Sequence, residues 1–179
     1  MIYFTSDFHF AHDRDFIYAA RGFKNIEEMN KEIVERMNFF IKPEDDLYIL
    51  GDIMLKDNER GMELLDQING WFHIIRGNHD TDTRMQLYEN HPRVVEVCDA
   101  KYLRWESYHF FLSHYPCLTG NLQKEMLKQM TLNLHGHTHD TDPFFNDLFY
   151  CYNVGVDAHN CYPVLINQII IDMKEKMRE

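Results

Sequence analysis

Short polar clusters built from Asp, Asn and His constrain the fold of this chain more than any other feature of its sequence. Each cluster directly follows a short apolar run that is typical of a buried strand. The clusters are Asp7-Phe8-His9, Gly51-Asp52, Gly77-Asn78-His79-Asp80, Ser113-His114 and Gly136-His137-Thr138-His139. In α/β proteins, ligands bind outside the carboxyl ends of the strands. The pattern therefore predicts an α/β fold whose strand ends bring these side chains to one site.

The first half of the chain alternates between predicted strands and helices. Apolar runs predict strands over 2–6, 47–51 and 71–76. Apolar residues at helical spacing predict a helix over 26–40, with Asn25 and Glu28 as a capping box at its start. A second helix is predicted over 62–68, ending at Asn69-Gly70.

The second half is richer in predicted strands. Runs over 94–97, 102–105 and 109–113 have short connections, which favour antiparallel pairing among them. A helical segment over 122–130 and strands over 131–134 and 149–154 follow, and a final strand leads into an amphipathic helix from 163 onward. The pattern predicts a layered α/β sandwich with mixed sheets.

Length and charge limit the classes of function. The chain has 179 residues, and 18 Lys and Arg against 29 Asp and Glu give a formal net charge of −11. This length predicts one domain over 1–179. The acidic balance argues against extended nucleic acid as a partner, because a grip on that backbone needs clustered Lys and Arg.

The same sequence predicts a reduced, cytoplasmic protein. Its four cysteines form no C-x-x-C pair. Nothing at the N-terminus resembles a secretory signal, and no apolar stretch approaches the ~20 residues that cross a bilayer. We therefore expect a soluble protein that has no membrane partner.

Two of the polar clusters place a pair of metal donors on one side of the chain. Asp7 and His9 are two residues apart, as are His137 and His139, and alternate side chains of an extended chain share a face. Carboxylate, imidazole and amide donors together suit Mn²⁺, Fe or Zn²⁺ better than an oxygen-only Ca²⁺ site or a thiolate-rich zinc site. Seven ligands are too many for one ion, whereas two ions that share a carboxylate keep positions for water and substrate.

The order D-x-H, G-D, G-N-H-D, a lone His and G-H-x-H, spread over the whole chain, resembles the calcineurin-like metallophosphoesterases of the small single-domain type. The resemblance implies an αββα sandwich, in which two mixed β-sheets pack together and helices flank them. It also implies a dinuclear metal centre. Asp7, His9 and His139 would hold one metal, Asn78, His114 and His137 the other, and Asp52 would bridge the two.

The resemblance also assigns chemistry to the site. Two divalent ions lower the pKa of a shared water, and the resulting hydroxide attacks phosphorus in line. His79 is expected to stabilise the transition state or to protonate the leaving oxygen, with Asp80 or Asp82 orienting its ring. Many relatives carry G-D-x-x-D, whose second Asp contacts the catalytic His. Here Asp52 is followed by Ile-Met-Leu, and Asp57 is a nearby carboxylate whose reach the sequence leaves open.

Three further residues are candidates for substrate contact. His12 lies three residues after His9 in the same loop, and Arg14 and Arg21 follow it, so these side chains are placed to contact the phosphate or the leaving group. For His12 a purely structural role is equally compatible with the sequence. His135 is open between support of its own loop and contact with a metal ligand.

These features favour a small metal-dependent phosphoesterase that hydrolyses phosphodiesters or phosphomonoesters of nucleotide type. Mn²⁺ is the first candidate for the two ions, with Fe, Ni²⁺ or Zn²⁺ as alternatives. Two other functions stay open: a non-catalytic metal-binding scaffold that docks a protein partner, and a nuclease, although the sequence has no Lys/Arg-rich run for a basic groove. The oligomeric state is also open.

Overall fold

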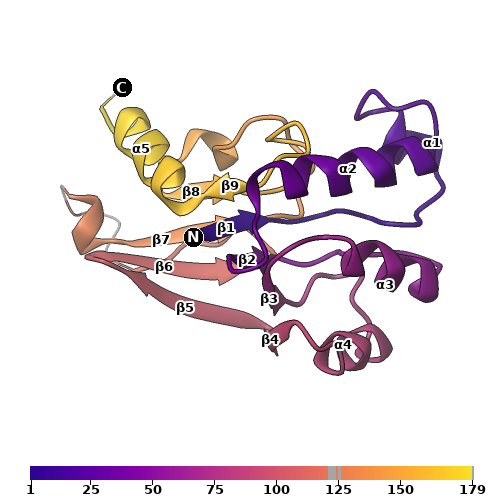
Figure 1. The fold of residues 1–179 in the computed structure, drawn as a ribbon. Coiled ribbons are helices and arrows are strands. Elements are labelled where there is room, and N and C mark those ends of the chain that lie inside the picture. Colours follow the sequence, from indigo (N-terminus) through magenta and orange to yellow (C-terminus); the bar gives the residue numbers. More distant parts are fainter. Residues whose placement is uncertain (121–123, 125, 179) are drawn as a thin grey trace.

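The computed structural model describes residues 1–120, 124 and 126–178. Two β-sheets pack against each other, and helices flank them (Figure 1). The strand order is β4-β3-β2-β1-β9 in the first sheet and β5-β6-β7-β8 in the second. The predicted α/β fold with two mixed sheets flanked by helices is confirmed.

The first sheet is parallel except at one edge. Its parallel strands are β1 (Ile2–Thr5), β2 (Asp46–Ile49), β3 (Trp71–Ile75) and β4 (Val94–Cys98), and β9 (Val164–Leu165) pairs antiparallel with β1. Neighbouring parallel strands end at the same edge of a sheet. The loops after β1, β2 and β3, which carry the first three polar clusters, therefore emerge side by side.

The second sheet carries the other two clusters. It consists of β5 (Ala100–Trp105), β6 (Tyr108–Ser113), β7 (Thr131–His135) and β8 (Cys151–Asn153). β5 and β6 pair antiparallel, whereas β6, β7 and β8 run parallel. The predicted antiparallel pairing of 94–97 with the strands that follow it is wrong. β4 instead pairs parallel with β3, and the chain passes at Asp99 from one sheet to the other.

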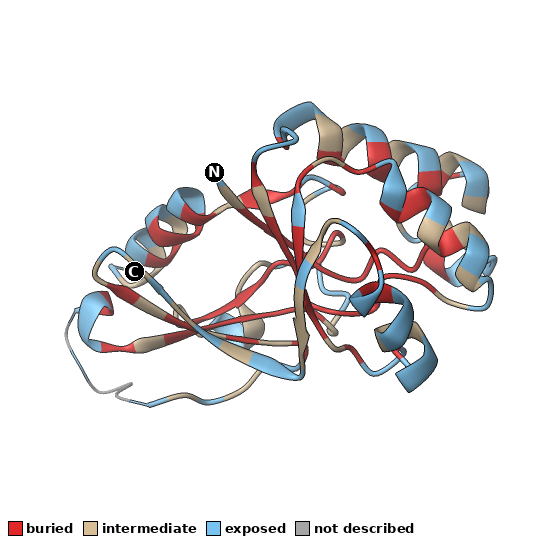
Figure 2. Ribbon diagram, turned by 60° about the horizontal axis from the view of Figure 1, so that its bottom comes forward, coloured by how far each residue is buried: buried red, intermediate tan, exposed pale blue. Residues whose placement is uncertain are grey.

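Two apolar cores lie on opposite faces of the first sheet. The first core packs that sheet against α2 (Ile26–Phe40), α3 (Asn58–Asp66) and α4 (Asp82–Glu89). The second core lies between the two sheets and includes α5 (Ile166–Lys176). Successive strand residues face opposite cores, as Tyr3 and Phe4 do. Figure 2 shows buried residues along the strands and the inner sides of the helices, with exposed residues on the outer sides of the helices.

The predicted helix over 26–40 is confirmed, with a small change at its start. The Asn25 side chain accepts a hydrogen bond from the Glu28 N–H at 2.9 Å, as expected of an N-cap. The Glu28 carboxylate accepts from the N–H of Lys24 at 2.6 Å instead of from that of Asn25. The second hydrogen bond of the capping box is therefore displaced by one residue.

Sequence patterns missed α4 and overestimated one other helix. In α4 only Tyr88 is buried, so the helix has almost no apolar stripe to detect. Of the helix predicted over 122–130, residues 122, 123 and 125 lie outside the described residues, and the described part contains a single turn, η1 (Leu127–Gln129). The remaining short elements are α1 (Asp15–Tyr18) and η2 (Phe145–Asp147). Among the described residues, no helix is both long and apolar enough to cross a membrane.

The core between the sheets predicts a large effect of one substitution. Phe110 on β6 is completely buried there, so Phe110→Ala should lower the free energy of unfolding by about 3–5 kcal/mol. Phe39→Ala is the matched control, because Phe39 is 76% exposed, and it should change that free energy by about 0.5 kcal/mol or less. Urea denaturation measures both. Equal effects of the two substitutions would contradict the assigned core.

Candidate metal centre

The loops that carry the polar clusters are tied together by backbone hydrogen bonds. The N–H of Asp7 donates to the carbonyl of Gly51 at 3.0 Å, and the N–H of His9 donates to the carbonyl of Asp52 at 3.1 Å. These bonds join the loops after β1 and β2. Across the sandwich, the N–H of Gly136 donates to the carbonyl of His114 at 3.0 Å, which joins the loops after β6 and β7.

Several candidate ligands have a strained backbone conformation. Asp7, His9, Asp52, His137 and His139 have φ values of 60°, 51°, 55°, 72° and 51°. Residues other than glycine rarely occupy this left-handed region, and such strain persists where the surrounding structure enforces it. The fold therefore holds these side chains in place at a cost in backbone energy, as functional sites commonly do.

Two glycines allow the loops to approach closely. At Gly51, where φ is +94°, an added Cβ would lie 2.5 Å from the Cα of Gly77 and 2.6 Å from Nδ1 of His114. At Gly136 it would collide with the Ser6 hydroxyl and the Asp7 carboxylate. The glycines of G-D and G-H-x-H are therefore needed so that strand ends from both sheets can meet.

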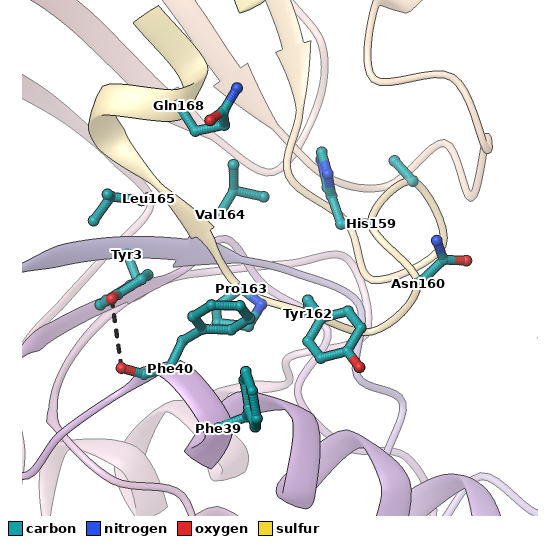
Figure 3. Close-up of a pocket in the computed structure, with 11 residues that line it drawn as sticks. Tyr3, Phe39, Phe40, His159, Asn160, Tyr162, Pro163, Val164, Leu165 and Gln168 are labelled. Carbon is teal, nitrogen blue, oxygen red and sulfur yellow. Dashed lines mark hydrogen bonds between the residues drawn. The ribbon is translucent and has the colours of Figure 1, made fainter. Parts of the chain in front are cut away.

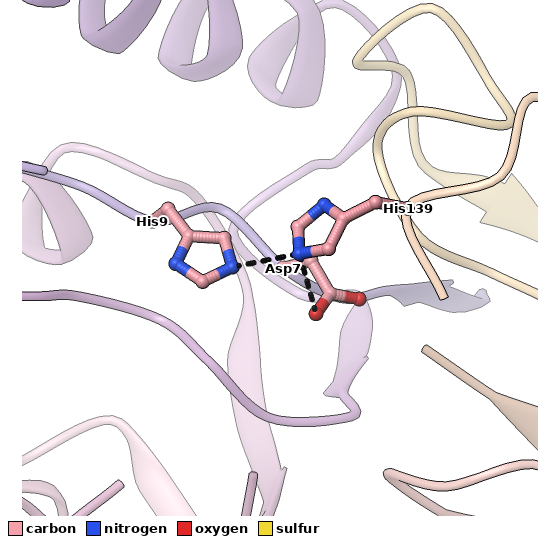
Figure 4. A group of neighbouring side chains, drawn as sticks. All are labelled: Asp7, His9 and His139. Atoms are coloured by element: carbon pink, nitrogen blue, oxygen red, sulfur yellow. Dashed lines mark hydrogen bonds and ion pairs between the residues drawn. The ribbon is translucent and has the colours of Figure 1, made fainter. Parts of the chain in front are cut away.

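One group of donors consists of Asp7, His9 and His139 (Figure 4), whose ligand atoms all lie within 4.8 Å of one another. The Nε2 atoms of His9 and His139 are 3.1 Å apart, and Nε2 of His139 is 4.0 Å from Oδ1 of Asp7. That oxygen is buried and has no hydrogen-bond partner. An unpartnered buried carboxylate oxygen beside two imidazole nitrogens is the donor arrangement that a cation would complete.

The protonation of this group favours a bound cation. Burial, together with the neighbouring His139, lowers the pKa of His9 to about 2, so this ring stays neutral and offers a lone pair. Burial also lowers the pKa of His139, but the hydrogen bond to Asp157 and the charge of Asp7 outweigh burial and raise it overall. Burial raises the pKa of the Asp7 carboxyl. The position between these side chains therefore attracts positive charge, either as a proton or as a metal ion.

The second group of donors consists of Asn78, His114 and His137. Oδ1 of Asn78 lies 2.8 Å from Nε2 of His114 and 2.8 Å from Nδ1 of His137. Nδ1 of His114 donates to the carbonyl of Leu50 at 2.7 Å, because a carbonyl oxygen only accepts. With Nδ1 as the donor, Nε2 is the ring atom that faces the amide oxygen of Asn78. An imidazole nitrogen and an amide oxygen that face each other are donors that a metal ion can bind together.

The carboxylate of Asp52 lies between the two groups. Its Oδ2 is 3.8 Å from Nε2 of His9 and 3.6 Å from Nε2 of His114. Its Oδ1 accepts the backbone N–H of His79 at 2.9 Å, and the side chain is 2% exposed. The structure thus brings all seven sequence-predicted ligands together, in two groups with a shared carboxylate. Nitrogen and oxygen donors of this kind suit divalent transition metals.

His79 lies beside this centre with its ring free to act. Its side chain is 44% exposed, and its Nε2 is 3.9 Å from Oδ2 of Asp52. The carboxylates expected to orient it have other partners. Asp80 accepts the N–H groups of Asp52 and Gly77 and the hydroxyl of Tyr88. Asp82 pairs with Arg76, and Asp57 caps α3. Asp80 therefore acts as a brace for the loops after β2 and β3.

Asp157, which the sequence analysis missed, supports the first donor group. Its Oδ2 accepts from Nδ1 of His139 at 2.9 Å, which leaves Nε2 of that ring as the atom that faces His9 and Asp7. Asp157 is also bound by two nitrogens of Arg21, each at 2.8 Å. The signal in the sequence was a carboxylate shortly after the strand predicted over 149–154. Its partners lie far away along the chain, so spacing alone could not identify them.

The three predicted substrate contacts differ in their surroundings. Arg21 is 3% exposed, and its guanidinium also donates to the carbonyls of Asp7 and Phe8. Its contact with substrate stays a prediction, and in the structure it braces the loop after β1. His12 is buried, with its ring centre 5.7 Å from that of His9. Arg14 is exposed at the start of α1.

His135 is the last residue of β7, directly before the G-H-x-H loop. Its Nδ1 is 2.8 Å from the carbonyl of Gly136, and its Nε2 is buried without a hydrogen-bond partner. Burial lowers the pKa of His135 to about 4. This position fits the supporting role in its own loop, one of the two roles that the sequence left open.

Comparisons with known proteins agree with this geometry. The family model described as calcineurin-like phosphoesterase matches residues 1–163. The chain is 34% identical to the uncharacterized protein MJ1445 of Methanocaldococcus jannaschii, over 94% of this chain and 89% of that protein. The crystal structure of AQ665 from Aquifex aeolicus, a protein of unknown function, is similar with a TM-score of 0.71 at 25% identity, covering 96% of this chain and 98% of that one.

The support of His139 by Asp157 leads to a prediction for metal affinity. Asp157→Asn removes the charge that orients His139 and pairs with Arg21, so Mn²⁺ should bind about 10–100-fold more weakly to one class of site. Isothermal titration of metal-free protein measures this. Asp66→Asn is the matched control, because Asp66 accepts from His91 at the same distance of 2.9 Å near the start of β3. Unchanged affinity in Asp157→Asn would contradict the assigned support.

Proposed function

Because the chain belongs to the calcineurin-like phosphoesterase family, we propose that it is a metal-dependent hydrolase of small phosphodiesters or phosphomonoesters of nucleotide type. The observation that carries the proposal is the position of Asp52, whose carboxylate lies between two groups of converging nitrogen and oxygen donors. A shared carboxylate between two donor sets is the arrangement of two-metal hydrolytic sites. The net charge of −11 favours a small ester over extended nucleic acid.

The proposed cofactor is a pair of divalent ions, with Mn²⁺ as the first candidate and Fe, Ni²⁺ or Zn²⁺ as alternatives. Asp7, His9 and His139 would hold one ion, Asn78, His114 and His137 the other, and Asp52 would contact both. Bound divalent ions lower the pKa of a water molecule to near neutrality and offset the negative charge of phosphate oxygens. This agrees with the hydroxide attack that the sequence resemblance implies.

The protein side chains supply position and a proton. Hydrolysis forms a bond between phosphorus and a water oxygen and breaks the bond to the ester oxygen, which then takes up a proton. We assign delivery of that proton to the His79 ring, which is partly exposed beside the donor groups. Asp52 fixes its backbone N–H, and Arg84 donates to its carbonyl. The ring is thus held on a fixed backbone while it stays open to substrate.

The direct test of this function compares two chromogenic esters. Metal-stripped protein, reconstituted with Mn²⁺, should hydrolyse bis(para-nitrophenyl) phosphate or para-nitrophenyl phosphate, and the ratio of the two rates gives the substrate class. Asp52→Asn should abolish the Mn²⁺-dependent rate because it weakens both donor groups, whereas Asp66→Asn should keep it. No turnover of either ester by folded, metal-loaded protein would contradict the proposal and favour a docking scaffold.

The role of His79 gives a separate prediction. His79→Gln removes the proton donor and should lower kcat by about 10²–10⁴-fold on an alkyl ester such as methyl trifluoroethyl phosphate, whose leaving alkoxide needs a proton. Mn²⁺ should bind as in the wild type, since His79 belongs to neither donor group. His109→Gln is the control, because the His109 ring hydrogen-bonds to Tyr102 on the outer face of the second sheet. A kcat close to the wild-type value in His79→Gln would show that another group supplies the proton.

A further inference from the structure

A pocket of about 380 Å³ adjoins the first donor group, next to His9 and His139. Its opposite wall is formed by the segment around α1, including Phe16, Ile17 and Ala20. His79 lines the same pocket. The proposed donor of a proton to the leaving oxygen, His79, is therefore in contact with this pocket.

The wall formed by α1 is apolar and carries an available aromatic ring. Phe16 is 66% exposed, and its ring meets the ring of His12 edge-on, with centres 5.8 Å apart and planes at 90°. Ile17 is buried in the first core and fixes the helix to the body of the protein. An aromatic face on a supported helix beside a reaction centre is suited to packing against a flat ring.

The two charged residues that line this pocket neutralise each other. Arg21 binds both carboxylate oxygens of Asp157 at 2.8 Å and also donates to the carbonyls of Asp7 and Phe8. Its guanidinium therefore has little capacity left to bind an anionic group in the pocket. Asp157 is likewise occupied, by Arg21 and His139. The pocket thus offers an apolar wall and imidazole rings to a ligand.

From this lining we infer that the pocket receives the alcohol part of the substrate, and that this alcohol carries an uncharged planar ring, as a phenol or a nucleoside does, packed against Phe16. The inference rests on the proposed function and specifies its substrate class. It places the ring in the pocket that His79 lines, so that the ester oxygen leaves beside the proton donor. A leaving group with its own phosphate or carboxylate would be disfavoured, because Arg21 is already paired.

The kinetic test compares two esters that differ in the leaving group. The leaving group of methyl para-nitrophenyl phosphate is an aryl alcohol. The leaving group of methyl trifluoroethyl phosphate is trifluoroethanol, a small and relatively acidic alkyl alcohol. Phe16→Ala should lower kcat/KM for the aryl ester by about five- to hundredfold, the range expected for loss of one aromatic stacking partner. The trifluoroethyl ester should keep its wild-type kcat/KM in this variant.

Phe39→Ala is the matched control for this test. Phe39 is also an exposed phenylalanine, but it lines a different and larger pocket of about 640 Å³ between α2, β9 and α5 (Figure 3). This substitution should leave kcat/KM unchanged for both esters. If Phe16→Ala lowered kcat/KM equally for both esters, or for neither, the inference would be overturned and the proposed function would stand. Wild-type protein inactive on both esters would overturn the proposed function and this inference with it.

A binding experiment tests the pocket without turnover. Adenosine, added to metal-free protein labelled with ¹⁵N, should shift the amide resonances of Phe16 and Ala20, and glycerol phosphate should leave them in place. In Phe16→Ala the shift of the Ala20 resonance should be lost, whereas Phe39→Ala should retain it. Shifts confined to other parts of the protein, or equal responses to glycerol phosphate, would contradict an uncharged planar ligand.

Discussion

The Asp52 carboxylate is the feature on which the rest of the site depends. It lies 3.8 Å from the ring of His9 and 3.6 Å from that of His114, so it joins donors from both sheets. A buried carboxylate is unfavourable unless positive charge compensates it. The fold nevertheless builds this arrangement, with a left-handed backbone at Asp52 and a close approach of Gly51 to Gly77 and His114. In the proposed function, bound divalent ions supply this compensating positive charge.

The ion pair between Arg21 and Asp157 supports the first donor group. Asp157 orients His139, and Arg21 holds Asp157 together with the backbone carbonyls of Asp7 and Phe8. The same ion pair removes free charge from the pocket beside the metal centre. The Arg21–Asp157 ion pair therefore links the predicted metal affinity to the kind of group that the pocket is proposed to accept. Loss of this ion pair would release His139 and would also leave an unpaired charge in the pocket.

Most of the fold and the convergence of the seven candidate ligands followed from the sequence because parallel strands end together, and the polar clusters directly follow strands. The supporting pair did not, since Arg21 and Asp157 are 136 residues apart and only tertiary structure joins them. The pairing of β4 was predicted wrongly because only residues 98–101 separate the strands predicted over 94–97 and 102–105, and so short a connection normally indicates a hairpin. α4 was missed because Tyr88 is its single buried residue, which leaves almost no apolar stripe to detect.

Anomalous X-ray diffraction from crystals of the Mn²⁺-loaded protein tests the central claim most directly. Two manganese peaks are predicted: one among Asp7, His9 and His139, and one among Asn78, His114 and His137. The Asp52 carboxylate should contact both peaks. A single peak, or two peaks that do not share Asp52, would contradict a two-metal centre built around this carboxylate.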